Sequence, residues 1–244
     1  MNRYKLLYTR SAICPANIFE EAQLRNCEII HIPTIGFEEV GDVKLVDLAD
    51  FNWIFFSSAT TVQFFFKRNK LPSDIKIAAI GINTAMEIRK NGYEVDFIPV
   101  VFTSQGFFSE WLGLNLPPQN IIFPKSDISD TIIQDALRQQ GHNVSVQVIY
   151  RTIFPEKGRE MLRQYFTERN PIDIALFASV SSWYNFLEVF VPFSQEYSLL
   201  CLASIGPVTT KAIEMSGYSV SYQSEEATMK SLFDTVFNKL DQNG

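Results

Sequence analysis

The chain has 244 residues, of which 46% are hydrophobic and 14% aromatic, so it is long enough for two ordinary domains or one large one with a packed core. Its formal net charge of −6 offers no basic stripe for phosphates, which argues against nucleic acid as a partner. Apolar runs such as 53–58 are far below the roughly 18 residues of a membrane span, and the first residues lack the apolar core of a secretory signal.

The number and spacing of the cysteines indicate the state of their thiols. Cys14, Cys27 and Cys201 form an odd set without C-x-x-C spacing, which argues against a disulfide framework and against a zinc site. We therefore expect reduced thiols in a soluble, cytoplasmic protein with no membrane partner.

Two stretches share one order of predicted elements, which we call block A. The first copy has a strand from Lys5, a loop that holds Arg10, a helix, and the extended run 31–37. The second copy starts at Asn120, carries Lys125 in the corresponding loop, and ends in the extended run 146–155. Each extended run ends its block and contains proline, so both are candidate linkers.

A longer block B, with three strand-helix units, follows each copy of block A. In the first copy, 54–65 is a buried strand that ends in small hydroxyl residues able to cap the next helix. The strand 77–80 then leads through Gly81 into a helix with a capping box, Thr84 to Glu87, and Gly92 at its end. The second copy resembles the first: 175–186 matches 54–65, and 205–218 shares Ile-Gly, Thr, Ile and Gly-Tyr with 80–93.

The remaining parts of the two B blocks also match. In the second copy, 202–205 is the strand, Pro207 suits the first helical turn, and Gly217 ends the helix. The segments 93–112 and 218–237 each predict a strand, a short polar loop, a Thr or Ser cap and an amphipathic helix.

The order A, B, A, B predicts an α/β protein with two doubly wound parallel-sheet domains of about five strands each. Periodicity leaves open which A joins which B. If the extended runs lie beside each other as a two-stranded β linker, the chain passes from domain one to domain two once and returns to domain one once. Domain one is then discontinuous, 1–33 plus 156–244, with domain two at 40–146 and linker strands at about 34–39 and 147–155.

Ligands in such sheets bind beyond the carboxyl ends of the strands. There the loops carry hydroxyls, glycines and two cations, and the helix N-termini present free N–H groups that can hold a polyanion. Plain N-capping is the alternative role for each Ser and Thr. The predicted substrate-binding residues are Arg10, Ser58, Gly81, Thr84, Thr103, Ser104, Lys125, Ser179, Ser181, Gly206, Thr209 and Thr228.

Common catalytic signatures are missing from the sequence, including nucleophile elbows, phosphate-binding loops and zinc motifs. One unusual stretch is "VIYRTI" (148–153), which places Tyr150 and Thr152 on one side of an extended linker and Arg151 on the other. A tyrosine at a domain junction can donate a proton to a ligand. Aromatic packing against the partner strand is the alternative.

Several of these motifs, in this order, resemble uroporphyrinogen-III synthases over essentially the whole chain: "YTR" (8–10), "FFSSATTVQFF" (55–65), "IIFPK" (121–125), "VIYRTI", "SIGPVTT" (204–210) and "EEAT" (225–228). The resemblance implies two α/β domains joined by a two-stranded ladder, with the first A paired with the last B. It also implies a monomer that needs no metal or cofactor. The implied reaction converts hydroxymethylbilane to uroporphyrinogen III in heme biosynthesis, with loss of water and inversion of ring D.

The resemblance gives roles to some residues. Tyr150 matches the hinge tyrosine regarded as the proton donor to the departing hydroxyl, and Thr209 matches the threonine of the I-G-P-x-T motif. Ser58 and Ser179 match serines that line the cleft, and Arg10 is a carboxylate contact. Departures from the family pattern are Ser58-Ala59 and Ser179-Val180 in place of S-P, and Pro124-Lys125-Ser126 in place of P-R-G.

A second class of protein fits the bare architecture. Two doubly wound domains joined by a double crossing also describe non-catalytic small-molecule-binding or sensing modules. An assay for the type III macrocycle distinguishes the two classes, because spontaneous closure of the linear substrate gives type I.

Overall fold

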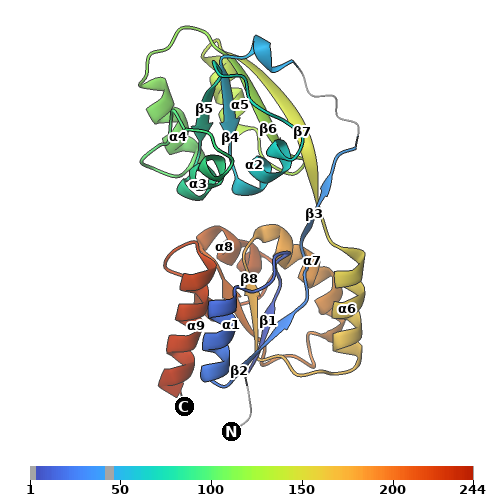
Figure 1. The fold of residues 1–244 in the computed structure, drawn as a ribbon. Coiled ribbons are helices and arrows are strands. Elements are labelled where there is room, and N and C mark those ends of the chain that lie inside the picture. The colour runs from blue at the N-terminus through green and yellow to red at the C-terminus, as the bar shows by residue number, and fades with distance from the viewer. Residues whose placement is uncertain (1–3, 42–46, 244) are drawn as a thin grey trace. The chain divides into compact units, whose positions relative to one another are not determined.

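The computed structural model describes residues 4–41 and 47–243 (Figure 1). The chain divides into two compact units, one formed by 1–36 and 153–244 and the other by 37–152. The chain thus leaves the first unit once and returns to it once. These crossings fall in β3 (Gly36–Glu39) and at the end of β7 (Asn143–Ile153), and these two strands are neighbours in one sheet.

The first unit contains a five-stranded sheet in the order β10-β9-β8-β1-β2, with parallel pairing throughout. Its strands are β1 (Tyr4–Tyr8), β2 (Cys27–His31), β8 (Ile174–Phe177), β9 (Cys201–Ser204) and β10 (Tyr222–Gln223). Its helices are α1 (Ala16–Leu24), α6 (Glu156–Thr167), α7 (Val180–Phe190), α8 (Pro207–Met215) and α9 (Met229–Asn243), with a 3₁₀ turn η2 (Val191–Phe193).

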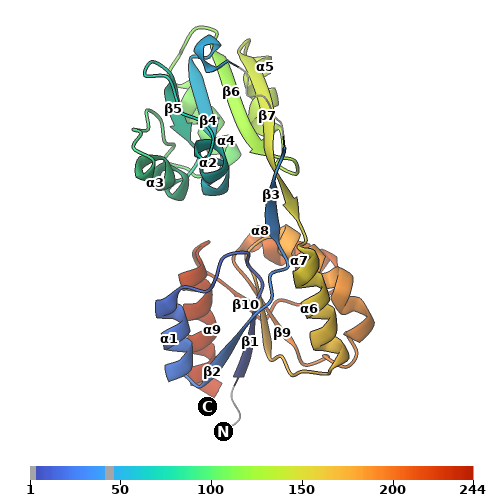
Figure 2. The ribbon, with the colours of Figure 1, turned by 45° about the vertical axis from the view of Figure 1, so that its right-hand side comes forward.

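Alternate side chains of the central strand β8 pack on opposite faces of this sheet, which explains why helices cover both faces. Ile174 and Leu176 of β8 pack in a core with α1 and α9, whereas Ala175 and Phe177 pack in a core with α6, α7 and α8. Figures 1 and 2 both show α1 and α9 side by side on the first of these faces. A four-residue strand that is apolar on both sides is typical of a parallel sheet buried between two helix layers.

The second unit has the order β3-β7-β6-β4-β5, and β7, β6, β4 and β5 pair in parallel. Its further strands are β4 (Trp53–Phe56), β5 (Lys76–Ala79) and β6 (Asn120–Ser126). Its helices are α2 (Ala59–Phe66), α3 (Ile82–Lys90), α4 (Ser104–Leu112) and α5 (Ile132–Gln139), with a 3₁₀ turn η1 (Leu48–Asp50). Helices α4 and α5 pack on one core and α2 and α3 on the other.

The two sheets repeat one strand order, which confirms the predicted fold class and its internal repeat. In the first unit, β2 and β1 of the first A block continue into β8, β9 and β10 of the last B block. In the second unit, β7 and β6 of the second A block continue into β4 and β5 of the first B block. Each B block therefore completes the A block other than the one that precedes it in sequence.

Two local predictions are wrong. Helix α3 begins after Gly81, which caps it without a side chain, so Thr84 lies buried inside the first turn and forms no capping box with Glu87. The strand expected after Tyr93 is reduced to one isolated bridge between Ala78 and Phe97. By contrast, Gly92 and Gly217 have φ values of 85° and 86°, the left-handed region expected at helix ends. No helix within the described ranges is long and apolar enough to cross a membrane.

Candidate functional site

A cavity of about 440 Å³ opens in the second unit where β4, β5 and β6 end. This position, at the carboxyl ends of parallel strands, is the usual ligand site of such folds, and the volume is within the usual range for small-molecule pockets. We call it the Tyr150 pocket; its lining is Ser57, Ser58, Ile80, Phe123, Ser126, Ile128, Ser129, Asp130, Ile133, Gln134 and Tyr150.

Tyr150 is 5% exposed and is held in the wall of this pocket by two aromatic rings. Its ring stacks on Phe64 with centroids 4.8 Å apart, and the edge of Phe37 lies 5.7 Å away. The phenol oxygen lies 3.4 Å from Oγ1 of Thr61, a long contact in which either atom can be the donor. The ring is therefore fixed by packing, while its hydroxyl is only weakly engaged.

Ser58 lies at the N-terminus of α2 and lines the same pocket. Its Oγ accepts a hydrogen bond from the backbone N–H of Thr61 at 3.1 Å and lies 2.8 Å from the Thr61 hydroxyl. A chain of three hydroxyls thus runs from Ser58 through Thr61 to Tyr150. Ser58 acts as an N-cap, and the first turn of α2 directs its N–H groups toward this end of the sheet.

Lys125 is 4% exposed and belongs to β6. Its ammonium donates to the carbonyl oxygens of Ser129 and, at 2.9 Å, of Asp130. The Ser126 and Ser129 hydroxyls lie 2.7 Å apart within the same loop. Lys125 therefore holds the loop that forms one wall of the pocket, a role that the sequence did not indicate.

Sequence reasoning missed Gln134, which lines the pocket from α5 and is 3% exposed. Its carboxamide oxygen has no hydrogen-bond partner among the residues that the structure describes. The signal was available: Ile133, Gln134 and Leu137 form the buried face of a short helix, where an apolar residue is expected in place of glutamine.

The other predicted residues of the second unit lie outside the lining of this pocket. Gly81 caps α3 through its backbone, Thr84 is buried, and Thr103 caps α4 by accepting from the N–H of Gly106 at 3.0 Å. Ser104 begins α4, and its side chain lies outside the described part of the structure.

In the first unit, the predicted residues again lie at strand ends and helix starts. Arg10 is exposed, and its carbonyl oxygen lies 2.8 Å from Nε2 of His31. Beside it, burial raises the pKa of Tyr8, and Arg10 acts in the opposite direction.

Helix N-termini hold four further predicted residues. Ser179 caps α7 in a capping box with Ser182, and Ser181 lies half-buried in the same first turn. Gly206 caps α8 through its backbone, and Thr209 is buried in the first turn of α8.

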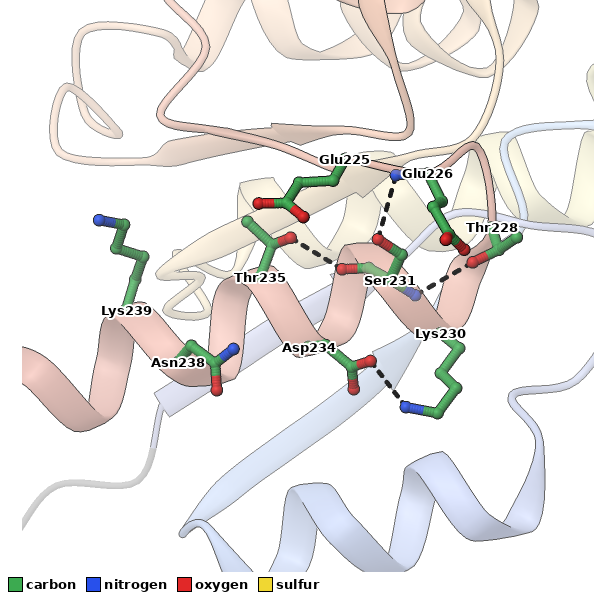
Figure 3. A pocket seen from close by; sticks show the side chains of 9 residues that line it. All are labelled: Glu225, Glu226, Thr228, Lys230, Ser231, Asp234, Thr235, Asn238 and Lys239. Carbon is green, nitrogen blue, oxygen red and sulfur yellow. Dashed lines mark hydrogen bonds and ion pairs between the residues drawn. The ribbon is translucent and has the colours of Figure 1, made fainter.

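Thr228 lines a different hollow, of about 460 Å³, along α9 (Figure 3). Its Oγ1 accepts from the N–H of Ser231 at 3.1 Å, and Lys230 is paired with Asp234 at 2.7 Å. Three carboxylates and two lysines line this hollow: Glu225, Glu226, Asp234, Lys230 and Lys239. This hollow lacks aromatic side chains, whereas Phe123 and Tyr150 line the Tyr150 pocket, so the Tyr150 pocket, although slightly smaller, is the better candidate for an aromatic ligand.

A metal site does not emerge from the described residues, since they contain no group of three or more His, Cys, Asp and Glu side chains that could hold an ion. The site thus consists of hydroxyls, a carboxamide, an acid and aromatic rings. With two doubly wound units joined by two crossings, these features define an α/β protein with a candidate ligand cavity at the carboxyl ends of the strands of its second unit.

Comparison with known proteins identifies the family. The model of the family described as "Uroporphyrinogen-III synthase HemD" matches residues 19–234, and the chain belongs to this family. It therefore has uroporphyrinogen-III synthase activity, a hydro-lyase reaction of tetrapyrrole biosynthesis. The non-catalytic module considered as an alternative is not supported.

Individual relatives agree with this assignment. The uroporphyrinogen-III synthase of Chlorobaculum parvum is 24% identical over 224 residues, which cover 88% of this chain and 90% of that protein. A mutant uroporphyrinogen III synthase of Thermus thermophilus matches with a TM-score of 0.67 and 15% identity over 99% of this chain and 100% of that one. The uroporphyrinogen-III synthetase of Helicobacter pylori also gives 0.67, at 14% identity over 97% and 99%. At these identities the solved structures show the likeness of fold.

Proposed function

We propose that the Tyr150 pocket holds the hydroxymethyl end of hydroxymethylbilane and that Tyr150 donates the proton with which its hydroxyl leaves. One observation carries this proposal: a buried tyrosine, fixed by two rings and weakly hydrogen-bonded, lines a cavity at the carboxyl ends of the strands. A general acid must be positioned first and must have a proton that is not otherwise committed.

In the proposed step, the C–O bond of the hydroxymethyl group breaks and its electron pair leaves with the oxygen. The phenol proton of Tyr150 then completes a water molecule. The remaining azafulvene cation is delocalised and reactive without a protein nucleophile. Attack by C16 of ring D gives the spirocyclic intermediate; cleavage and re-closure at C19 then release the C19 proton, which restores the phenol.

The protein's main contribution in this proposal is positioning, because attack by C19 alone would give the type I isomer. The acidic side chains of the substrate are assigned to helix N-termini, of which α2 at Ser58 is the one that lines the pocket. The proposal keeps Arg10, Ser179, Thr209 and the other predicted loop residues except Thr228 as further contacts to these carboxylates; Thr228 lines the separate hollow along α9. Lys125 is reassigned from a direct contact to support of the pocket wall.

We further propose that the protein works as a cytoplasmic monomer. All groups used in the mechanism come from one chain, and Cys14 and Cys201 form no disulfide. The direct test generates hydroxymethylbilane enzymatically, adds the purified protein, and separates the type I and type III macrocycles after oxidation. Type III is expected; type I alone would refute the proposed function.

A further inference from the structure

Thr61 is the buried member of the hydroxyl chain that runs from Ser58 to Tyr150. It is 1% exposed, and its Oγ1 lies 2.8 Å from Oγ of Ser58 and 3.4 Å from the phenol oxygen of Tyr150. The cap of α2 fixes its place, because the backbone N–H of Thr61 donates to Ser58 Oγ at 3.1 Å. A hydroxyl has one proton, so Thr61 can donate to only one of its two oxygen neighbours at a time.

Loss of the phenol proton changes which neighbour needs this donor. While Tyr150 holds its proton, the contact between Thr61 and Ser58 is the shorter and stronger one. A phenolate has no proton to give, so its oxygen can only accept from Thr61. Ser58 can then donate to Oγ1 of Thr61, since either atom of that pair can be the donor. The change requires only that two hydroxyl protons rotate.

The surroundings of Tyr150 increase the need for a donor. Its ring packs on Phe64 and Phe37, and phenylalanine side chains carry no hydrogen-bonding group for an oxygen anion. Among the described residues, the Thr61 hydroxyl is the hydrogen-bond partner of the phenol oxygen. A buried charge without a partner costs far more than a buried neutral hydroxyl. Removal of the Thr61 hydroxyl therefore raises the free energy of the phenolate more than that of the phenol.

On the basis of the proposed function, we propose that Thr61 is a positioning residue that donates a hydrogen bond to the oxygen of Tyr150 as the phenol proton passes to the departing hydroxyl. Hydrogen bonds to charged oxygens are shorter and stronger than neutral ones, so the long contact tightens as the charge develops. An interaction that is stronger in the transition state than in the ground state raises kcat. Thr61 thus acts on kcat through Tyr150, and KM is independent of it.

Thr61→Val tests this inference, because it removes the hydroxyl and keeps the branched shape of the side chain. We expect kcat to fall about 10- to 100-fold with KM unchanged, since a hydrogen bond to a charged oxygen is lost. Thr61→Ser keeps the hydroxyl and should recover most of this loss. Thr235→Val is the matched control: this half-buried helix threonine of the first unit donates to the carbonyl of Ser231 at 2.8 Å, and its substitution should leave kcat and KM unchanged.

A double substitution separates an action through Tyr150 from a structural role. No phenolate forms in Tyr150→Phe, so adding Thr61→Val to it should lower kcat by less than about threefold. Equal losses of kcat in the wild-type and Tyr150→Phe backgrounds would overturn the inference. So would a wild-type kcat in Thr61→Val, or a Thr61→Ser variant as slow as Thr61→Val.

Thermal unfolding and the Tyr150→Phe variant complete the test. Thr61→Ala deletes the hydroxyl without adding a methyl group in its place, so it should show the same loss of kcat as Thr61→Val. Failure of both variants to fold would overturn the inference, because the hydroxyl would then serve the fold. A wild-type rate in Tyr150→Phe refutes the proposed proton donor, whereas a slow Tyr150→Phe beside a normal Thr61→Val refutes only the role of Thr61.

Discussion

The ring of Tyr150 lies on the ring of Phe64, with centroids 4.8 Å apart and 10° between their planes. With the edge of Phe37 5.7 Å away, this stacking fixes the ring in the second unit. The two roles that the sequence allowed for Tyr150, aromatic packing and proton donation, therefore use different parts of one side chain. The ring packs on Phe64, and the residue lines a cavity in which its weakly bonded hydroxyl is proposed to act.

Tyr150→Phe separates these roles. The substitution keeps the stacked ring and removes the hydroxyl, whose contact with Thr61 is long at 3.4 Å. We expect kcat to fall about 100-fold, in the range of lost general-acid catalysis, and the melting temperature to stay near that of the wild type. Turnover of hydroxymethylbilane and thermal unfolding are the measurements.

Tyr165→Phe is a control for this substitution. Tyr165 lies in the first unit, donates to the carbonyl of Pro171 at 3.0 Å, and has its pKa raised to about 12, mainly by burial. We expect no change in turnover when its hydroxyl is removed. Wild-type rates in Tyr150→Phe would exclude the proton-donor role.

The fold was predictable because its signals are local and repeated. Short strands such as Ile174–Phe177 are apolar on both sides, and glycines at 92 and 217 mark helix ends by their left-handed conformation. The pairing of A and B blocks was not predictable from periodicity, since it depends on contacts between distant segments such as β1 and β8. The resemblance to the family, and not the sequence pattern, predicted the pairing of the first A block with the last B block.

The candidate site was predictable only in part. The hydroxyl residues that follow predicted strands included Ser58, and the extended linker pattern singled out Tyr150. Both residues line the same pocket. Lys125 was assigned to the substrate because a sequence does not show that carbonyls at 129 and 130 already occupy its ammonium. Gln134 was missed although its place on an apolar helix face can be read from the sequence, because only the structure shows that this face lines the pocket.

Ser58→Ala and Ser58→Asp test whether Ser58 faces the acidic substrate. Alanine removes the helix cap and should lower the free energy of unfolding by about 1 kcal/mol. Aspartate is an equally good cap, so stability should be kept. Its negative charge should raise KM about tenfold, which corresponds to about 1.4 kcal/mol.

Thr228→Asp is the matching substitution in the hollow along α9, where Thr228 also caps the start of a helix. Because Thr228 lines the hollow along α9 and not the Tyr150 pocket, Thr228→Asp should leave KM unchanged. An equal rise in KM for both variants would restore the sequence-based prediction that Thr228 contacts the substrate.

Lys125→Met distinguishes support of the pocket wall from direct contact with a substrate carboxylate. Two hydrogen bonds from a buried ammonium would be lost, so the free energy of unfolding should fall by about 1.5–3 kcal/mol, measured with urea. Lys157→Met, at an exposed position of α6, should change it by less than about 0.5 kcal/mol. A large rise in KM without loss of stability would instead indicate a direct carboxylate contact.

His142 should make the second unit sensitive to acid. Burial lowers the pKa of His142; its ring lies 4.8 Å from that of Trp111, and its Nδ1 accepts from the N–H of Gln119 at 3.1 Å. The unfolded imidazole takes up a proton near its usual pKa of about 6.5, whereas the folded one does so only at lower pH. Between these two values the unfolded state binds more protons, so stability rises with pH in this window.

The contribution of neutral His142 is therefore complete above about pH 6.5 and is lost as the pH falls toward the folded pKa. His142→Asn keeps an acceptor for Gln119 and removes the titrating group. We expect the wild type to lose more free energy of unfolding than His142→Asn between about pH 7.5 and about pH 5, measured with urea at each pH. Carboxylates titrate in both proteins, so the difference between the two curves isolates the histidine. Parallel curves would show that His142 is not kept neutral by the fold.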